Sequence, residues 1–291
     1  MTPTVAFLGL GRMGSRIARN IAEAGFPIVL YNRTPATADE LASEVGGRAA
    51  STPADAAREA DVTVTSLADD AAARSIYEGP DGLIAGLRDG AVAADMSTLD
   101  PATVLDLNRQ IREAGASFVD APVSGSTASV ETKALSIMAG GSAEDIDRVR
   151  PVLEATSSKI VRVGDVGAGA ALKLAVNAIL FGLNNSVAEA LVLAERAGID
   201  RTVAYDVIAG SAVGAPMVQY RRPMFEHPGE TPPAFTIDLA VKDLRLILGL
   251  AERSGATMPL TERSLEVMQE ASDRARGGED IANVAEHLRN D

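Results

Sequence analysis

Several residue types that carry specific chemistry are rare or absent in this chain of 291 residues. It has no cysteine, which excludes disulfides and thiolate chemistry. Its two histidines, His227 and His287, are far apart in the sequence, so we expect no histidine-based metal site and no metal cofactor. Aromatic residues make up only 3% of the chain, which disfavours a flat hydrophobic ligand.

Basic residues and membrane signals are also scarce. The chain has 27 Lys and Arg against 40 Asp and Glu, a formal net charge of −13, which argues against nucleic acid or an anionic membrane as partner. No run of 18 apolar residues is free of charge, and we expect no transmembrane span. The N-terminus begins a strand without a basic leader region, so we expect no signal peptide and a cytoplasmic location.

The glycine-rich stretch near the start of the chain predicts a dinucleotide site. An apolar strand pattern at residues 5–8 precedes it, and helical spacing at 17–22 follows. In such a loop the first glycine permits the turn, the second admits a pyrophosphate, and the third lets the helix pack closely. A chance glycine turn is the weaker alternative in this strand–loop–helix context. The loop consists of Gly9, Leu10, Gly11, Arg12, Met13 and Gly14.

The end of the second predicted strand, residues 28–31, indicates which dinucleotide is bound. An NAD site usually has an Asp or Glu there, which bonds the ribose 2′-hydroxyl. This chain has Asn32, Arg33 and Thr34 instead. An arginine flanked by two small donors binds a 2′-phosphate, whereas the alternative is a solvated arginine in a turn. We therefore predict NADP(H) rather than NAD(H).

Strand and helix patterns alternate as far as residue 163, which predicts a Rossmann-type doubly wound α/β domain over residues 1–163. The loops after its strands carry further candidates. Leu67 and Thr98 are expected near the cofactor, and Thr98 could instead cap the helix that starts at Pro101. Ser124 and Gly125 offer a hydroxyl and close backbone N–H groups that suit a carboxylate, although an ordinary Ser-Gly turn would have the same sequence.

A long helix is predicted over about residues 168–195, and it is apolar on nearly all faces. Lys173, Asn177 and Asn184 are spaced by four and seven, so they share one face. A lysine on a buried face usually has a partner or a task, which makes Lys173 a catalytic candidate. The alternative is a lysine that extends to water at the helix start.

Beyond the long helix, the sequence predicts helices at 201–209, 236–254, 260–276 and 280–288, with a proline-rich loop at 210–233. Residues 164–291 are therefore expected to form an all-helical C-terminal domain for substrate binding and dimerisation, joined to the first domain by the long helix. One small helical domain cannot bury the apolar side chains on all faces of that helix, so we expect a homodimer or homotetramer.

Four motifs, in order, make the chain resemble the β-hydroxyacid dehydrogenases, the family of 3-hydroxyisobutyrate dehydrogenase. They are FLGLGRMG at 7–14, DAPVSG at 120–125, GAGAALKLAVN at 167–177, and Phe235 followed by VKD at 241–243. The resemblance implies Lys173 as catalytic acid/base, and Asn177, Ser124 and Gly125 as substrate contacts. It also implies that Thr98 and Lys242 contact the cofactor.

The chain departs from the family pattern at two places. Ser126 and Thr127 follow the SG pair where a second glycine is common, and Lys133 replaces a glycine before the next strand. The SGS sequence and Asn32-Arg33-Thr34 are similar to the NADP-using glyoxylate and succinic semialdehyde reductase branch. Imine reductases share the fold but usually replace the lysine, so Lys173 argues against them.

Together these features predict an NADP-dependent oxidoreductase for a small β-hydroxyacid or aldehyde acid, with Lys173 as general acid/base. An imine reductase-like enzyme is one alternative. A non-catalytic NADP-binding protein is another, disfavoured because a protein that only bound cofactor would not need both Lys173 and Asn177 on one helix face.

Overall fold

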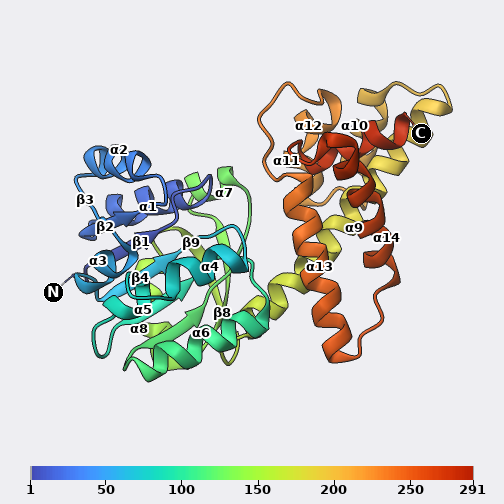
Figure 1. The fold of residues 1–291 in the computed structure, drawn as a ribbon. Coiled ribbons are helices and arrows are strands. Elements are labelled where there is room, and N and C mark those ends of the chain that lie inside the picture. The colour runs from blue at the N-terminus through green and yellow to red at the C-terminus, as the bar shows by residue number, and fades with distance from the viewer. Residues whose placement is uncertain (1, 291) are drawn as a thin grey trace. The chain divides into compact units, whose positions relative to one another are not determined.

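The computed structural model describes residues 2–290, which form two compact units that divide within helix α9 (Ala168–Arg196) (Figure 1). Unit 1 extends to Lys173, and unit 2 begins at Leu174. The boundary predicted from the sequence, between residues 163 and 164, falls at the end of strand β9 (Ser157–Gly164). The units divide later because α9 packs Ala170 into the core of the first and Leu174 into the core of the second.

Unit 1 is built on a nine-stranded sheet with the order β3-β2-β1-β4-β5-β6-β8-β7, in which β9 also pairs with β8. Strands β1 to β6 run parallel, whereas β8 is antiparallel to β6 and β7. The order reverses at β1, which is the doubly wound arrangement, and in such sheets ligands bind outside the carboxyl ends of the strands at this point. The strands are β1 (Val5–Leu8), β2 (Ile28–Tyr31), β3 (Arg48–Ala49), β4 (Val62–Thr65), β5 (Val92–Asp95), β6 (Ser117–Asp120), β7 (Val123–Ser124) and β8 (Leu135–Gly140).

Helices cover both faces of this sheet because successive strand residues point to opposite sides. On β1, Val5 and Phe7 join one hydrophobic core, and Ala6 and Leu8 join the other. The first core is closed by α1 (Gly14–Glu23), α2 (Pro35–Val45), α7 (Thr127–Glu131) and α8 (Ala143–Leu153). The second is closed by α3 (Pro53–Arg58), α4 (Asp70–Tyr77), α5 (Leu83–Gly86) and α6 (Pro101–Glu113).

The start of α6 decides between two alternatives for Thr98. Asp100, not Thr98, caps this helix, because its side chain accepts a hydrogen bond from the Ala102 backbone N–H over 2.8 Å. Pro101 occupies the first helical position, where its missing N–H costs nothing.

Unit 2 is helical, as predicted, and packs around the C-terminal part of α9. Phe181 and Leu191 of α9 share its core with Leu244 and Ile247 of α13. The helices that follow α9 are α10 (Arg201–Gly210), α11 (Pro216–Tyr220), α12 (Arg222–Glu226), α13 (Ile237–Ser254), α14 (Pro259–Ala271) and α15 (Val284–Arg289).

Three predicted segments of unit 2 differ in detail. The predicted loop at 210–233 contains α11 and α12, because Pro216 and Pro223 fall in the first turn of a helix, where proline is favoured. The helix predicted to Arg276 ends at Ala271 and passes into a π-helical turn (Ser272–Arg276). The last predicted helix begins as a short 3-10 turn (Ile281–Asn283) before α15.

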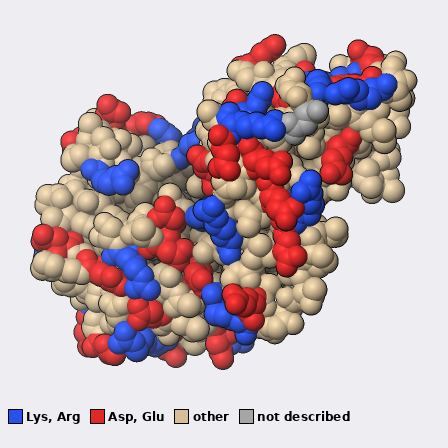
Figure 2. Space-filling view, turned by 45° about the vertical axis from the view of Figure 1, so that its right-hand side comes forward, with Lys and Arg blue, Asp and Glu red and all other residues tan. Residues whose placement is uncertain are grey.

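Helix α9 is the one helix among the described residues that is long and apolar enough to cross a membrane, with a mean hydropathy of 1.4. Core helices of soluble proteins meet the same criterion, and α9 buries Asn177 and Asn184 inside unit 2. Figure 2 shows acidic and basic side chains interspersed over the visible face, as the charge composition leads one to expect.

Candidate active site

The three glycines of the loop after β1 have different surroundings. Gly9 has a φ of +95°, and a Cβ on it would overlap the Ser66 carbonyl and lie 2.9 Å from a Leu67 methyl carbon. A Cβ on Gly14 would overlap the Gly9 carbonyl oxygen, so α1 starts directly against the turn. No protein atom lies within 4 Å of the Cβ position of Gly11, which leaves its backbone open to a ligand.

The start of α1 fits a dinucleotide pyrophosphate. Within the described residues no side chain caps this helix, and its first turn carries no acidic residue. The helix therefore offers N–H groups and its positive dipole end to an anion. Among the other loop residues, Leu10 is buried and Met13 packs on the core, whereas Arg12 is exposed.

At the end of β2, Asn32 has a structural task that the sequence did not predict. Its Oδ1 accepts the Leu10 N–H over 3.1 Å, and its Nδ2 donates to the Thr34 carbonyl over 3.2 Å. Asn32 therefore ties the glycine-rich loop to the neighbouring strand. Arg33 is exposed and, among the described residues, is the one basic residue that lines a cavity of about 350 Å³, whose wall also carries the acidic residues Glu78 and Asp81.

A buried carboxylate, Asp95, organises the loops that carry Leu67 and Thr98. It accepts hydrogen bonds from Thr65 Oγ1 over 2.6 Å and from the Ser97 N–H over 2.8 Å. Ser97 Oγ in turn accepts the Leu67 N–H over 2.8 Å, so the loops after β4 and β5 are linked. Burial raises the pKa of the Asp95 carboxyl. Sequence reasoning missed Asp95, although an aspartate that ends an apolar strand was a usable signal.

The predicted substrate segment follows β6. Ser124 lies in β7, half-buried, and Gly125 is exposed with a φ of +145°. A Cβ on Gly125 would lie 2.8 Å from Leu135 and 2.9 Å from Ser129, so a glycine is required there. Asp120, which opens this segment and is 1% exposed, accepts hydrogen bonds from the Gly167 and Ala170 N–H groups; sequence reasoning missed it as well.

Downstream of this segment, Lys133 has a φ of +54°, in the left-handed region that favours glycine. This backbone angle means that the lysine is held in a strained conformation, which a glycine would adopt without that strain.

The predicted residues of α9 occupy distinct environments. Lys173 is half-buried, and Asn177 follows one helical turn later. Asn177 donates to Asp243 Oδ2 over 2.7 Å, and Lys242 Nζ lies 2.8 Å from Asp243 Oδ1. The Lys242 charge is therefore partly compensated inside unit 2. Asn184, on the same face, donates to the Ile281 carbonyl over 2.9 Å and has a structural role.

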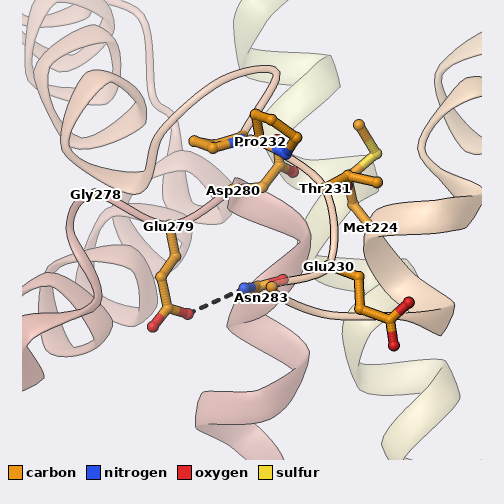
Figure 3. A pocket seen from close by; sticks show the side chains of 10 residues that line it. Met224, Glu230, Thr231, Pro232, Gly278, Glu279, Asp280 and Asn283 are labelled. Atoms are coloured by element: carbon orange, nitrogen blue, oxygen red, sulfur yellow. Dashed lines mark hydrogen bonds between the residues drawn. The ribbon is translucent and has the colours of Figure 1, made fainter.

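Unit 2 also contains a cavity of about 390 Å³ beside Asp280, shown in Figure 3. Asp280 forms a buried ion pair with Arg221 and accepts the Phe235 N–H over 3.1 Å, which fixes the end of the proline-rich segment. Asn283, on the cavity wall, donates to Glu279 over 3.0 Å. None of the predicted site residues lines this cavity.

The predicted site residues thus fall into two groups. In unit 1 the glycine-rich loop, residues 32–34, Leu67, Thr98, Ser124 and Gly125 follow the carboxyl ends of strands, and Lys173 lies in the second turn of α9. Asn177 and Lys242 belong to unit 2 and share Asp243. Within residues 2–290 no group of three His, Cys, Asp or Glu could hold a metal ion. A dinucleotide cradle and a lysine together suit hydride transfer coupled to proton transfer.

Comparisons with known proteins agree with this geometry. The model for the NAD binding domain of 6-phosphogluconate dehydrogenase matches residues 4–164, and the model for NAD-binding of NADP-dependent 3-hydroxyisobutyrate dehydrogenase matches residues 167–288. The chain is 33% identical to glyoxylate/succinic semialdehyde reductase 2, chloroplastic, of Arabidopsis thaliana, over 99% of this chain and 80% of that protein. It is 34% identical to 3-sulfolactaldehyde reductase of Escherichia coli, over 98% of this chain and 95% of that one.

Among solved structures, the crystal structure of a 3-hydroxyisobutyrate dehydrogenase from Salmonella typhimurium superposes with a TM-score of 0.90 at 29% identity. The match covers 98% of this chain and 99% of that chain, so both compact units are included.

Proposed function

Because this chain belongs to the β-hydroxyacid dehydrogenase family, we propose that it is an NADP(H)-dependent reductase of short aldehyde acids that also oxidises the corresponding β-hydroxyacids. The chain is an oxidoreductase that acts on CH–OH groups of a small molecule with a nicotinamide cofactor. The observation that carries the finer proposal is the helix α9, on which Lys173 and Asn177 are one turn apart in a chain that also has a complete glycine-rich cradle.

The choice of NADP(H) rests on the end of β2. A carboxylate is absent from residues 32–34, and Arg33 borders a cavity at the carboxyl end of that strand. A guanidinium forms charge-assisted hydrogen bonds with a 2′-phosphate that it cannot form with a 2′-hydroxyl. The missing carboxylate at residues 32–34 and the presence of Arg33 therefore support NADP(H) as the proposed cofactor.

In the proposed reaction a bound nicotinamide supplies or accepts the hydride. The Lys173 ammonium donates a proton to the carbonyl oxygen during reduction, and the neutral amine takes a proton from the hydroxyl during oxidation. Asn177 orients the substrate by hydrogen bonding. Ser124 and the backbone at Gly125 bind the substrate carboxylate, for which a hydroxyl and the N–H of an exposed glycine are suitable donors.

A spectrophotometric panel at 340 nm tests this function. Reduction with NADPH should be seen for glyoxylate or succinic semialdehyde, and oxidation with NADP for 3-hydroxyisobutyrate. In the Lys173→Ala variant we expect turnover to fall on the order of 10² to 10⁴-fold while NADPH still binds. Near-normal turnover in that variant would refute the role of Lys173.

The same panel separates the alternatives. Turnover of cyclic imines, with every acid inert, would favour an imine reductase and would remove the carboxylate role from Ser124 and Gly125. NADPH binding without any turnover would favour a non-catalytic binding protein.

The proposal includes a homodimer, or a tetramer built from dimers, formed through unit 2. Ile179 and Leu193 on α9 are 74% and 71% exposed, and Val203 and Val207 on α10 are 55% and 68% exposed. Large apolar side chains that are this exposed are typical of an association surface, and a second copy of the chain would cover them. Light scattering at micromolar concentration should give at least twice the 30.1 kDa chain mass, and Val203→Glu with Val207→Glu should reduce it to one chain. A single-chain mass for the unaltered protein would rule the dimer out.

A further inference from the structure

The first turn of α9 is held by a side chain from a distant part of unit 1. Asp120, the last residue of β6, accepts the Gly167 N–H over 2.9 Å and the Ala170 N–H over 2.7 Å. Gly167 is the N-cap residue of α9, because its carbonyl accepts the first helical hydrogen bond, from Ala171. The carboxylate therefore satisfies two of the N–H groups that lack a partner at a helix start, from 47 residues away in the sequence.

The surroundings of Asp120 leave room for this contact only because two neighbours are glycines. A Cβ on Gly140, which faces Asp120 across the β6–β8 ladder, would overlap Asp120 Oδ1 and lie 2.9 Å from Oδ2. A Cβ on Gly169, in the first turn of α9, would lie 2.8 Å from Oδ2. The helix start, the β8 end and the carboxylate are thus in direct contact, and a shift of one displaces the others.

Asp120 lies next to two parts of the proposed site, the helix that carries Lys173 and the segment that carries Ser124 and Gly125. Lys173 follows Gly169 by four residues and Ala170 by three, so it lies one turn further along the same helix face. In the other direction, Asp120 opens the segment that carries Ser124 and Gly125. Two hydrogen bonds to one side chain therefore help to set the position of the Lys173 backbone relative to that segment.

We propose that Asp120 is a positioning residue of the reaction: by holding the first turn of α9 against the end of β6, it sets the location of Lys173. This inference rests on the proposed role of Lys173 as general acid/base. Asp120 itself is buried and acts through the helix rather than on substrate.

The electrostatics of Asp120 add a pH dependence to this role. Burial raises the pKa of its carboxyl to about 6, and the negative Asp95 on the adjacent strand β5 adds to the increase, while the N–H groups of Gly167 and Ala170 oppose it. On the other packed elements, β8 carries no titratable side chain between Leu135 and Gly140, α9 carries Lys173, and Arg162 of β9 donates to the nearby Gly141 carbonyl. Protonation near pH 6 replaces one acceptor oxygen by a hydroxyl, which weakens the hold on the helix start.

The test compares Asp120→Asn with Lys173→Ala and with a matched control, Asp165→Asn. Asp165 is 97% exposed near the same helix end, and its carboxylate pairs with Arg162, so its loss removes a charge without freeing the first-turn N–H groups. The measurements are kcat and KM from pH 5 to 9, with whichever aldehyde acid or hydroxyacid the unaltered protein turns over fastest. The dissociation constant of NADPH is measured by fluorescence.

We expect Asp120→Asn to lower kcat at least tenfold, to change KM and the NADPH dissociation constant by less than about threefold, and to flatten the decline of kcat below pH 6. Asp165→Asn should match the unaltered protein. An unchanged kcat and pH profile in Asp120→Asn, in an enzyme that Lys173→Ala inactivates, would overturn the positioning role alone. Near-normal turnover of Lys173→Ala would overturn the proposed role of Lys173, and the positioning role with it.

If Asp120→Asn does not fold, Gly140→Ala provides a second route, because it keeps the carboxylate but its added Cβ would overlap Asp120 Oδ1 and so disturb the contact with the helix start. Hydrogen exchange at Gly167 and Ala170 then reports the contact directly. Faster exchange at these two amides together with a lower kcat would support the proposal, and faster exchange with an unchanged kcat would overturn it.

Discussion

Asn177 donates its side-chain amide to Asp243 over 2.7 Å, and the two residues are only 3% and 1% exposed. This hydrogen bond joins α9 to α13 inside unit 2. Since Asp243 also pairs with Lys242, the amide helps to balance a buried carboxylate. The residue proposed to orient the substrate therefore also stabilises the helical unit.

Replacement of Asn177 by alanine should affect stability and turnover together. Loss of the donor leaves Asp243 short of a partner, so the free energy of unfolding should fall by about 1–3 kcal/mol in urea titrations. Asn184→Ala is the matched control, because it removes a buried amide from the same helix face. We expect Asn184→Ala to lose stability but to keep kcat/KM; an equal loss of kcat/KM in both variants would argue against a substrate role for Asn177.

Arg33→Ala should weaken NADPH binding about tenfold or more and leave NADH binding unchanged. The expected loss corresponds to a charge-assisted contact of about 1.5–3 kcal/mol. Arg58, exposed at the end of α3, provides a control of equal charge, and Arg58→Ala should bind both cofactors normally. Fluorescence titration of both cofactors gives the dissociation constants. A preference for NADPH that survives in Arg33→Ala would contradict the proposed contact between Arg33 and the 2′-phosphate.

Lys133→Gly should stabilise the protein. Lys133 has a φ of +54°, and this left-handed conformation costs a residue with a Cβ about 1–2 kcal/mol. Glycine removes this strain, but its greater conformational entropy in the unfolded chain offsets part of the gain. The net expectation is a gain of about 0.5–1 kcal/mol in unfolding free energy. Lys133→Ala, which removes the charge but keeps a Cβ, should show no gain. If the alanine variant proves as stable as the glycine variant, backbone strain is not the cause.

The pKa of Asp120 predicts a slope of stability with pH. Because its folded pKa of about 6 lies above the ordinary 3.8, the folded state binds the extra proton between these values. Protonated Asp120 therefore adds at most about 3 kcal/mol to the free energy of unfolding. This contribution is fully present below about pH 4 and is lost as the pH rises through 6. Asp120→Asn should lack this component, so the difference in unfolding free energy between the two proteins should change over pH 4–6.5. A constant difference would show that Asp120 titrates normally.

Local patterns predicted much of this protein. Alternating apolar strands and periodic helices indicated the doubly wound unit, and the unbroken apolar pattern indicated α9 within one residue of its observed end at Arg196. The steric need for glycine at positions 9 and 14 also followed from the sequence, because a glycine requirement depends on backbone shape near the residue itself. The family resemblance was confirmed by both family models, whereas the residue roles in the site remain predictions.

Other features were decided only by the tertiary structure. The sequence did not indicate that Asn32 would tie down the glycine-rich loop, that Asp95 would link two strand-end loops, or that Asp120 would cap α9. Each of these side chains accepts a hydrogen bond from a group that is distant in the sequence, and that partner is determined by how strands and helices pack rather than by spacing along the chain. A buried carboxylate must find donors, but only the fold determines which N–H groups are within reach. The sequence by itself therefore specified the elements and the candidate chemistry, and packing specified the hydrogen bonds that hold the candidate residues in place.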